Sequence, residues 1–250
     1  MLTRLVLNQR PADLTPAERE VLRAAITEVR EYGAQELVTP AHRPLDSSVL
    51  LLDGMMARFV EDRRGDRQQM VAVHVPGDFV DLHAYPLKVL DHEIRTLTPV
   101  TAAVVPHRKL DVIQHQHPDL ALKLWYLTML DAAMHRQWIF RIGRLRAPAR
   151  LAHFLCETNA RLSIVGLSDG CQFDLPLTQA DLGAICGLSA IYVNRVMRQL
   201  REQHLVSFHG YRVQIHDLAG LVRLGEFRAD YLYFNEDVGR RVTGVPPRFD

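Results

Sequence analysis

The 250-residue sequence predicts an α+β protein in three consecutive parts: an N-terminal antiparallel β-roll of the jelly-roll kind, one long helix, and a C-terminal helix-turn-helix with a β-hairpin wing. Three observations predict this class. Short apolar runs separated by turn signals fill residues 36–108, no glycine or proline interrupts residues 119–142, and residues 178–203 carry the glycine spacing of two crossing helices. We expect four segments: 1–117 (N-terminal helix and roll), 118–146 (long helix), 147–230 (helix-turn-helix domain) and 231–250 (irregular tail).

The composition is that of a globular protein, with 48% hydrophobic and 24% charged residues. No apolar run approaches the roughly 20 residues that span a bilayer, and the first residues lack the apolar core of a signal peptide, so we expect a cytoplasmic protein. The cysteines form no CxxC pair, which argues against a disulfide framework or a zinc ribbon; they are Cys156, Cys171 and Cys186.

An amphipathic helix is predicted from Thr15 to Tyr32, because its apolar residues recur at helical spacing. Thr15 is the expected N-cap and Pro16 the first helical residue. Residues 36–108 then predict the roll, with strands at 48–52, 70–75 and 100–105 and turns at Asp53-Gly54, 64–66 and 76–78. Asp-Gly is typical of a two-residue hairpin turn, so we expect a hairpin at Asp53-Gly54.

Two heptad rows of apolar residues run along the long helix and predict a seam. They are Leu120, Leu127 and Met134 in one row and Leu124, Trp138 and Leu145 in the other, with Asp131 interrupting the second. A seam of this kind on a helix of about 27 residues is best buried by a second copy of the chain. The alternative is that the seam packs on its own roll.

Residues 178–203 have the pattern of a helix-turn-helix. Gly183 lets two helices approach closely and Gly187 supplies the tight turn, while a small apolar core is expected from Leu182, Leu188, Val193 and Val196. A further helix is expected after Pro148, and a β-hairpin around His209-Gly210 follows the second helix. Ser189 is placed to cap that second helix.

The outward face of the second helix is predicted to enter a DNA major groove; it comprises Ala190, Ile191, Asn194, Arg195 and Arg198. Arg195 suits guanine, Asn194 suits adenine, and Ile191 suits a thymine methyl group. Phosphate contacts are expected from Thr178, Gln179, Ser189 and Tyr192. The alternative is an ordinary pair of helices whose arginines are merely solvated. Six positions that fit the helix-turn-helix pattern together, and the hairpin that follows, argue against this alternative. Between residues 141 and 228, arginines outnumber acidic residues by four, which also favours DNA.

These motifs together resemble the Crp/Fnr superfamily of bacterial transcription regulators, over nearly the whole chain. The resemblance is carried by VPGDFV (75–80), HPDL (117–120), RLAHFL (150–155), the long stretch from Leu177 to Val206, and SFHGYRVQI (207–215). It implies a cyclic-nucleotide-binding-like roll, a dimerisation helix and a winged helix that binds a near-palindromic operator as a homodimer. It also implies that His209 in the wing contacts a phosphate. The expected partners are double-stranded DNA, a second copy, RNA polymerase for an activator, and an unidentified small effector, with no membrane.

Two departures from the family pattern matter. Relatives that read the best-known half-sites carry a glutamate where this chain has Ile191, so a different half-site is expected, while Arg195 matches the base-reading arginine. Relatives that bind cyclic AMP place a glutamate and an arginine where this chain has Leu82 and Leu90, which disfavours cyclic AMP. The candidate effector pocket comprises Leu82, His83, Leu90, His135 and Arg136.

No cofactor is expected. The N-terminal cysteines that hold an iron–sulfur cluster in oxygen-sensing relatives are missing here. A haem or metal site is the alternative, because His74, His83 and His92 recur every nine residues, but no strand or helix geometry makes this spacing converge. An enzyme, a metal-dependent cupin-like roll, is the competing function; it needs an HxH motif followed by a glutamate, and residues 36–108 contain none. We therefore expect a DNA-binding regulator and not an enzyme.

Overall fold

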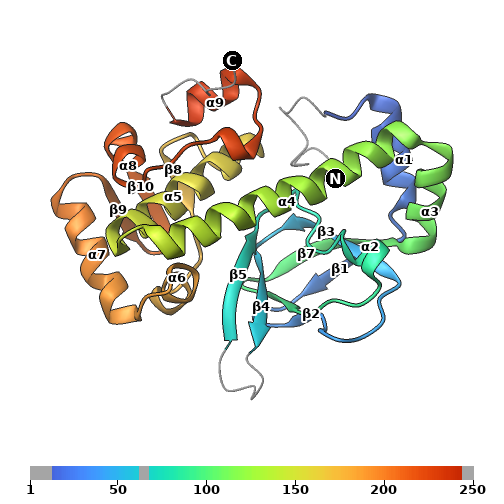
Figure 1. Cartoon of the computed structure of the whole chain (residues 1–250), viewed down its shortest axis with the longest axis horizontal. Helices are drawn as coiled ribbons and strands as arrows, with labels where there is room; N and C mark the ends of the chain where they lie inside the picture. Colours follow the sequence, from blue (N-terminus) through green and yellow to red (C-terminus); the bar gives the residue numbers. More distant parts are fainter. Residues whose placement is uncertain (1–12, 62–67, 244–250) are drawn as a thin grey trace. The chain divides into compact units, whose positions relative to one another are not determined.

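The computed structural model describes residues 13–61 and 68–243. These residues form two compact units that divide inside the long helix, between Ala132 and Ala133, and each unit is described by itself. The mixture of antiparallel sheets and helices confirms the predicted α+β class (Figure 1).

The N-terminal unit is the predicted roll, with three helices and the first half of a fourth. Its elements are α1 (Pro16–Ala25), β1 (Glu28–Tyr32), β2 (Leu37–Thr39), β3 (Ser47–Asp53), β4 (Met56–Glu61), β5 (Gln68–His74), α2 (Ala84–Leu87), β6 (Glu93–Thr96), β7 (Val100–Pro106), α3 (His107–Gln116) and the start of α4 (Pro118–Arg144). The strands form two antiparallel sheets, ordered β1-β7-β3 and β2-β6-β4-β5. The three predicted strands are confirmed as β3, β5 and β7.

Alternation along β3 divides its side chains between two cores. Leu50 packs with the helical side, in a cluster that includes Leu120 and Leu124 of α4. Val49 and Leu51 point the other way and pack with residues such as Met56 of the facing sheet. Successive side chains of a strand point to opposite faces. A strand that is buried on both faces, such as β3, therefore needs an uninterrupted run of apolar residues.

The first predicted helix is shorter than expected. Thr15 and Pro16 start α1 as predicted, and Thr15 and Glu18 complete a capping box, but the helix ends at Ala25. Residues 28–32 instead form β1, which pairs antiparallel with β7. The prediction was wrong here because pairing with a strand some 70 residues away overrides local helical spacing.

Asp53-Gly54 is a turn but not a hairpin turn. It joins β3 to β4, which lie in different sheets. Gly54 has φ of 86°, and an added Cβ would lie 2.4 Å from the carbonyl oxygen of Pro99, so the crossing requires glycine. The turn expected at residues 64–66 lies outside the described residues.

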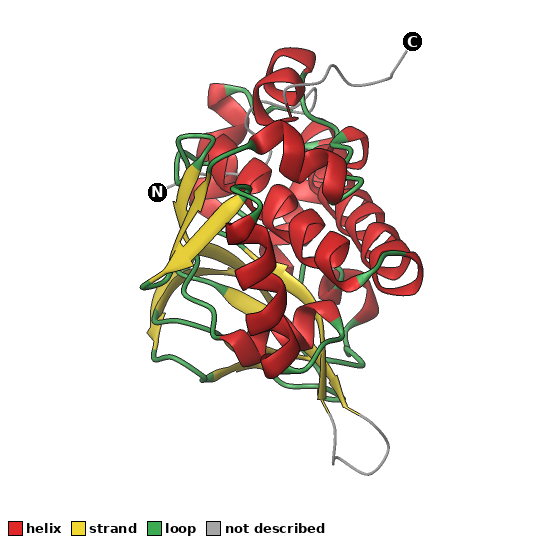
Figure 2. Ribbon diagram, turned by 90° about the vertical axis from the view of Figure 1, so that its left-hand side faces the viewer, coloured by secondary structure: helices red, strands yellow, loops and turns green. Residues whose placement is uncertain are grey.

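The C-terminal unit begins at residue 133 within α4. It continues with α5 (Ala147–Ile164), β8 (Gln172–Asp174), α6 (Gln179–Cys186), α7 (Ala190–Glu202), β9 (Val206–His209), β10 (Arg212–Ile215), α8 (Leu218–Leu224), the 3-10 helix η2 (Asp230–Leu232) and α9 (Glu236–Thr243). Helix α5 is the centre of this unit and is buried on nearly all sides. The three strands form one small sheet, ordered β8-β10-β9, and are drawn in yellow in Figure 2, like the strands of the roll.

The end of the chain also differs from the prediction, because residues expected to be irregular form η2 and α9. Val238 and Val242 of α9 are buried four residues apart, and the helix packs against α5. Tyr231 of η2 donates its hydroxyl to Oε2 of Glu157 over 2.6 Å, while Trp138 of α4 donates to Oε1 over 3.0 Å. One buried carboxylate of α5 therefore ties both α4 and the C-terminal segment to the core.

Helix α4 has the predicted length, but its heptad seam does not face outward. Leu120, Leu124 and Leu127 are buried in the core of the roll, and Trp138 and Leu145 are buried in the C-terminal unit. The alternative, packing on the chain's own roll, is therefore correct for Leu120, Leu124 and Leu127. The burial of Trp138 and Leu145 in the C-terminal unit was not predicted. A different row remains exposed on the N-terminal part of α4, namely Leu122, Trp125 and Met129. Within the described residues no helix combines the length and apolar character needed to cross a bilayer.

Candidate nucleic-acid interface

Helix α6 starts at a complete capping box. Oγ1 of Thr178 accepts the backbone N–H of Asp181 at 3.1 Å, and the Asp181 carboxylate accepts the backbone N–H of Thr178 at 2.8 Å. The Thr178 hydroxyl also donates to that carboxylate at 2.7 Å. Thr178, which was predicted to contact a phosphate, is therefore exposed, and its side chain also stabilises the first turn of α6.

The two glycines act as predicted. A Cβ on Gly183 would lie 2.5 Å from the carbonyl oxygen of Leu188, so the turn and α6 can touch only because the side chain is absent. Gly187 ends α6 with φ of 65°. Leu182, Val193 and Val196 are buried as predicted, whereas Leu188 is half-buried.

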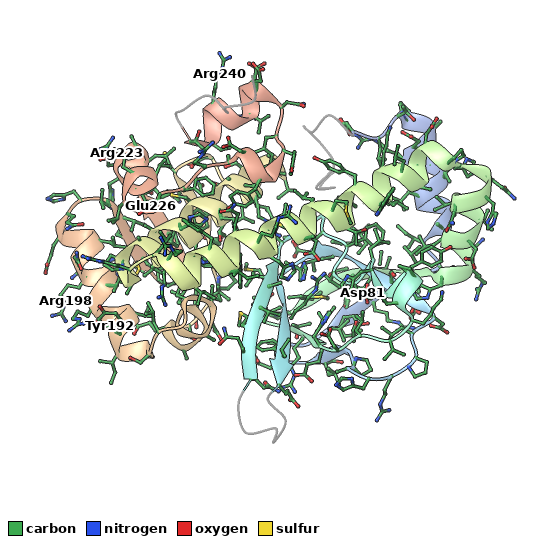
Figure 3. All side chains as sticks on the ribbon, in the orientation of Figure 1. Asp81, Tyr192, Arg198, Arg223, Glu226 and Arg240 are labelled. Atoms are coloured by element: carbon green, nitrogen blue, oxygen red, sulfur yellow. The ribbon has the colours of Figure 1, made fainter. Side chains whose placement is uncertain are left out.

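Helix α7 separates its faces as expected. Val193, Val196 and Leu200 are buried against α6 and the sheet, whereas Ala190, Asn194, Arg195 and Arg198 are exposed. Among the described residues, Ile191 is the most exposed large apolar residue, at 86%. Ser189 caps the helix, its Oγ accepting the backbone N–H of Tyr192 at 3.3 Å. Figure 3 shows Tyr192 and Arg198 at the outer edge of the unit.

Two side-chain contacts organise the exposed face. Nδ2 of Asn194 donates to Oε1 of Gln179 over 3.3 Å, which links α7 to the first residue of α6. The guanidinium of Arg195 lies 4.2 Å from the centroid of the Tyr192 ring. The structure therefore brings together in pairs four residues that were predicted separately, two for bases and two for phosphates.

The wing is a tight hairpin beside α7. Gly210 and Tyr211 both have positive φ, 57° and 64°, which is the backbone of a type I′ turn. His209 ends β9, pairs with Arg212 across the hairpin and is exposed, so its ring is free to approach a phosphate. Arg212 forms an ion pair with Asp174 of β8 at 3.0 Å, which braces the wing.

The electrostatic field around α7 favours the binding of an anion. Arg195, Arg198 and Arg201 are exposed along α7, and the first turn of α7 carries no acidic residue. The N-terminus of α7 adds the positive end of a helix dipole. The surface that α7 presents is thus cationic and shaped by one exposed isoleucine.

The predicted effector residues are divided between the two units. Leu82 and Leu90 are buried core residues, and His83 lies in the same unit, where its ring centroid is 5.3 Å from that of His92. His135 and Arg136 belong to the other unit.

Arg58 is the residue that sequence reasoning missed. Its Nε and Nη2 donate to the carbonyl oxygen of Val80 at 3.0 and 2.6 Å, and its Nη1 donates to Asp131 of α4 at 2.6 Å. The side chain of Arg58 is only 3% exposed. The sequence did contain a signal for this ion pair. Arg58 and Asp131 each interrupt a row of apolar residues with a charge, and the two charges are opposite.

Two of the three histidines that recur every nine residues lie side by side, with the ring centroids of His83 and His92 5.3 Å apart. His74 and His92 are buried, His83 lies against His92, and all three lie within electrostatic range of Arg58. Burial, followed by the charge of Arg58, lowers the pKa of His74 to about 4 and that of His83 to about 3. These imidazoles are therefore neutral at pH 7. Within residues 13–61 and 68–243, no group of three or more His, Cys, Asp or Glu side chains is arranged to hold a metal ion.

Comparison with known proteins identifies the C-terminal part. Residues 149–224 match the family model of the Crp-like helix-turn-helix domain. The chain is 23% identical over 214 residues to the anaerobic regulatory protein of Haemophilus influenzae, covering 86% of this chain and 82% of that protein. It is 26% identical over 178 residues to the transcriptional activator protein FnrA of Stutzerimonas stutzeri, covering 71% and 72%.

Solved structures show the same fold. FixK2 from Bradyrhizobium japonicum superposes with a TM-score of 0.72 at 23% identity, covering 79% of this chain and 96% of that chain. TTHA1359, a Crp/Fnr-family transcriptional regulator from Thermus thermophilus, superposes with a TM-score of 0.61 at 22% identity, covering 80% and 100%. The roll, the long helix and the helix-turn-helix therefore recur together in other proteins.

Proposed function

We propose that the chain is a DNA-binding transcription regulator of the Crp/Fnr superfamily, like the relatives it resembles, and that it binds a near-palindromic operator as a homodimer through α7. Its relatives are transcription regulators and not enzymes, so the cupin-like enzyme is set aside. In this proposal residues 1–117 form the roll, 118–146 the dimerisation helix, 147–230 the DNA-binding domain and 231–250 a C-terminal extension.

The exposed face of α7 is the observation that carries the proposal. Its apolar residues face the domain core, while Ile191, Asn194, Arg195 and Arg198 face outward. An exposed helix of this kind fits the major groove, where Arg195 reads guanine, Asn194 reads adenine and Ile191 touches a thymine methyl group. Ala190 is small enough to allow close approach of the helix N-terminus.

Phosphates on either side of the groove position the domain. Thr178 and Gln179 at the start of α6, Ser189 and Tyr192 at the start of α7, and His209 in the wing are the proposed contacts. They lie at helix N-termini or at the hairpin tip, where backbone N–H groups add to the side-chain donors.

The second copy is proposed to pack on the exposed row of α4. Leu122, Trp125 and Met129 follow a spacing of three and four residues, so they share one face of the helix. With Thr15, Glu18, Asp119, Lys123 and Tyr126 they line a groove of about 730 Å³. A dimer would present two copies of α7 about 34 Å apart, one turn of DNA.

The roll is proposed to act as a scaffold or as a sensor of an effector other than cyclic AMP. A cyclic phosphate needs an uncommitted cation, and Arg58 is committed to Val80 and Asp131. His83 remains a candidate contact for an effector, as do His135 and Arg136 on α4. Action as an activator that recruits RNA polymerase rests on relatives named as transcriptional activators.

Selection of bound sites from random DNA, followed by gel shift at several salt concentrations, tests the proposal. We expect an enriched palindrome whose binding weakens steeply with salt, because α7 and its surroundings neutralise phosphates. An absence of any enriched sequence, even with cell extract added as a source of effector, contradicts it.

A further inference from the structure

The contact between Tyr192 and Arg195 is the most specific feature of the exposed face of α7. The two residues are three apart on the helix and therefore neighbours on its surface. The Arg195 guanidinium lies over the face of the Tyr192 ring, 4.2 Å from its centroid. That distance falls within the range in which the negative ring face attracts a cation.

We propose that Tyr192 is a positioning residue, whose ring holds the Arg195 guanidinium in place for a guanine and so sets specificity at that base pair. This inference rests on the proposed function, since it concerns how α7 reads DNA. It assigns the aromatic ring a task separate from the phosphate contact of the hydroxyl group.

A stack orients an arginine without using its donors. The five N–H groups of a guanidinium lie in its plane, so contact through the face leaves the fork free to donate to N7 and O6 of guanine. Among the described residues, Arg195 has no hydrogen bond or ion pair that would occupy that fork. An acidic neighbour would also hold the side chain, but it would compete with the base.

Tyr192 lies in the first turn of α7, where the helix cap fixes its backbone. The backbone N–H of Tyr192 is bonded to the cap residue Ser189 at 3.3 Å, and its side chain is half-buried. Ser189 therefore fixes the backbone of Tyr192, and the Tyr192 ring in turn contacts the guanidinium of Arg195. Arg198, one turn further on, has no aromatic ring under its guanidinium among the described residues and provides a comparison within the same helix.

The benefit of this arrangement is entropic. A free arginine side chain loses rotamer freedom when it is fixed against a base. A side chain already held on a ring loses less, so the correct base gains affinity relative to a wrong one. The number of neutralised phosphates is unchanged, so the salt dependence is expected to stay the same when only the stack is lost.

The test compares Tyr192→Leu with Tyr192→Phe in the full-length protein. Binding is measured by fluorescence anisotropy on the selected operator and on an operator with the Arg195-read guanine replaced. We expect Tyr192→Leu to reduce discrimination between the two by about 2- to 5-fold, the range for an exposed cation–π contact. Tyr192→Phe keeps the ring and is expected to keep the discrimination of the wild type.

The Tyr192→Leu substitution is also tested in two variant proteins, Arg195→Ala and Arg198→Ala, as a double-mutant cycle. In Arg195→Ala, the Leu substitution is expected to cause no further loss of discrimination, whereas in Arg198→Ala its effect persists. Equal loss in the Phe and Leu variants would overturn the proposal in favour of the hydroxyl group, and wild-type discrimination in the Leu variant would overturn it outright. Circular dichroism checks that the helix content of the variants equals that of the wild type. A wild-type protein that selects no sequence at all refutes the proposed function instead, so the two failures are distinct.

Discussion

Arg58 of β4 and Asp131 of α4 form an ion pair of 2.6 Å inside the N-terminal unit, 73 residues apart in sequence. The arginine is almost completely buried, and its remaining donors bond to the carbonyl oxygen of Val80. The pair thus connects the sheet, the segment before α2 and the long helix. Because buried charges must be paired, the three elements are held in one arrangement.

Arg58→Met is expected to destabilise the N-terminal unit by about 3–5 kcal/mol, because it leaves the Asp131 carboxylate without its cation. Met fills a similar volume, so little of the loss comes from a cavity. Urea unfolding measures the free energy. The double variant Arg58→Met with Asp131→Leu is expected to recover part of the loss, and a single variant as stable as the wild type contradicts the assigned role.

Ile191→Glu is expected to change the selected half-site. The new carboxylate accepts a hydrogen bond from cytosine N4, which isoleucine cannot do, so a cytosine should be enriched at the position that Ile191 faces. Selection from random DNA with both proteins measures the change. Ile191→Val, which keeps an apolar contact, serves as the control; identical selected sites for the Glu variant and the wild type would remove Ile191 from the reading face.

Trp125→Glu is expected to weaken the dimer at least tenfold, because a charge would replace a large apolar side chain that is 62% exposed in the single chain. Analytical ultracentrifugation measures the change. Val112→Glu is the matched control, since Val112 is apolar and exposed but lies on α3, outside the α4 row. If the two variants dissociate alike, the dimer does not use this face.

The burial of His74 predicts a dependence of stability on pH. Its pKa is about 4 in the folded protein against 6.5 in the unfolded chain, so the unfolded chain binds more protons in that window. The contribution is complete above pH 6.5 and is lost as the pH falls, by about 2 kcal/mol at pH 5.

Urea unfolding at pH 7 and pH 5 tests this for the wild type and His74→Gln. The comparison between the two proteins is needed because burial raises the pKa of Asp81 to about 6, which acts in the opposite direction. The variant is expected to show a smaller loss between the two pH values than the wild type. A loss of the same size in both proteins would show that His74 does not titrate in this window.

What the sequence predicted well was local. Gly183, Gly187 and Ser189 act within a few residues of their partners, so their spacing alone predicts the two helices, the turn and the cap. The outward face of α7 follows from the same periodicity. The length of α4 was predicted for a similar reason, since no breaker interrupts it.

What the sequence did not predict depends on distant pairing. Residues 28–32 are a strand only because β7 lies beside them, and the N-terminal part of the heptad rows of α4 is buried because the core of the roll includes it. The contact between the rings of His83 and His92, and the ion pair of Arg58 with Asp131, likewise depend on residues that are distant in sequence or lie in separate elements. Periodicity gives the faces of an element but not what covers each face.

Methylation interference on the selected operator tests the central claim, that α7 of a dimer reads the major groove. Dimethyl sulfate modifies N7 of guanine in the major groove, where Arg195 is expected to donate. We expect interference at two guanines that are related by the dyad and lie about one DNA turn apart, and we expect this interference to be lost in Arg195→Ala but not in Arg198→Ala. Interference confined to adenine N3 in the minor groove, or interference at one guanine without a second guanine related to it by the dyad, would contradict major-groove reading by a dimer.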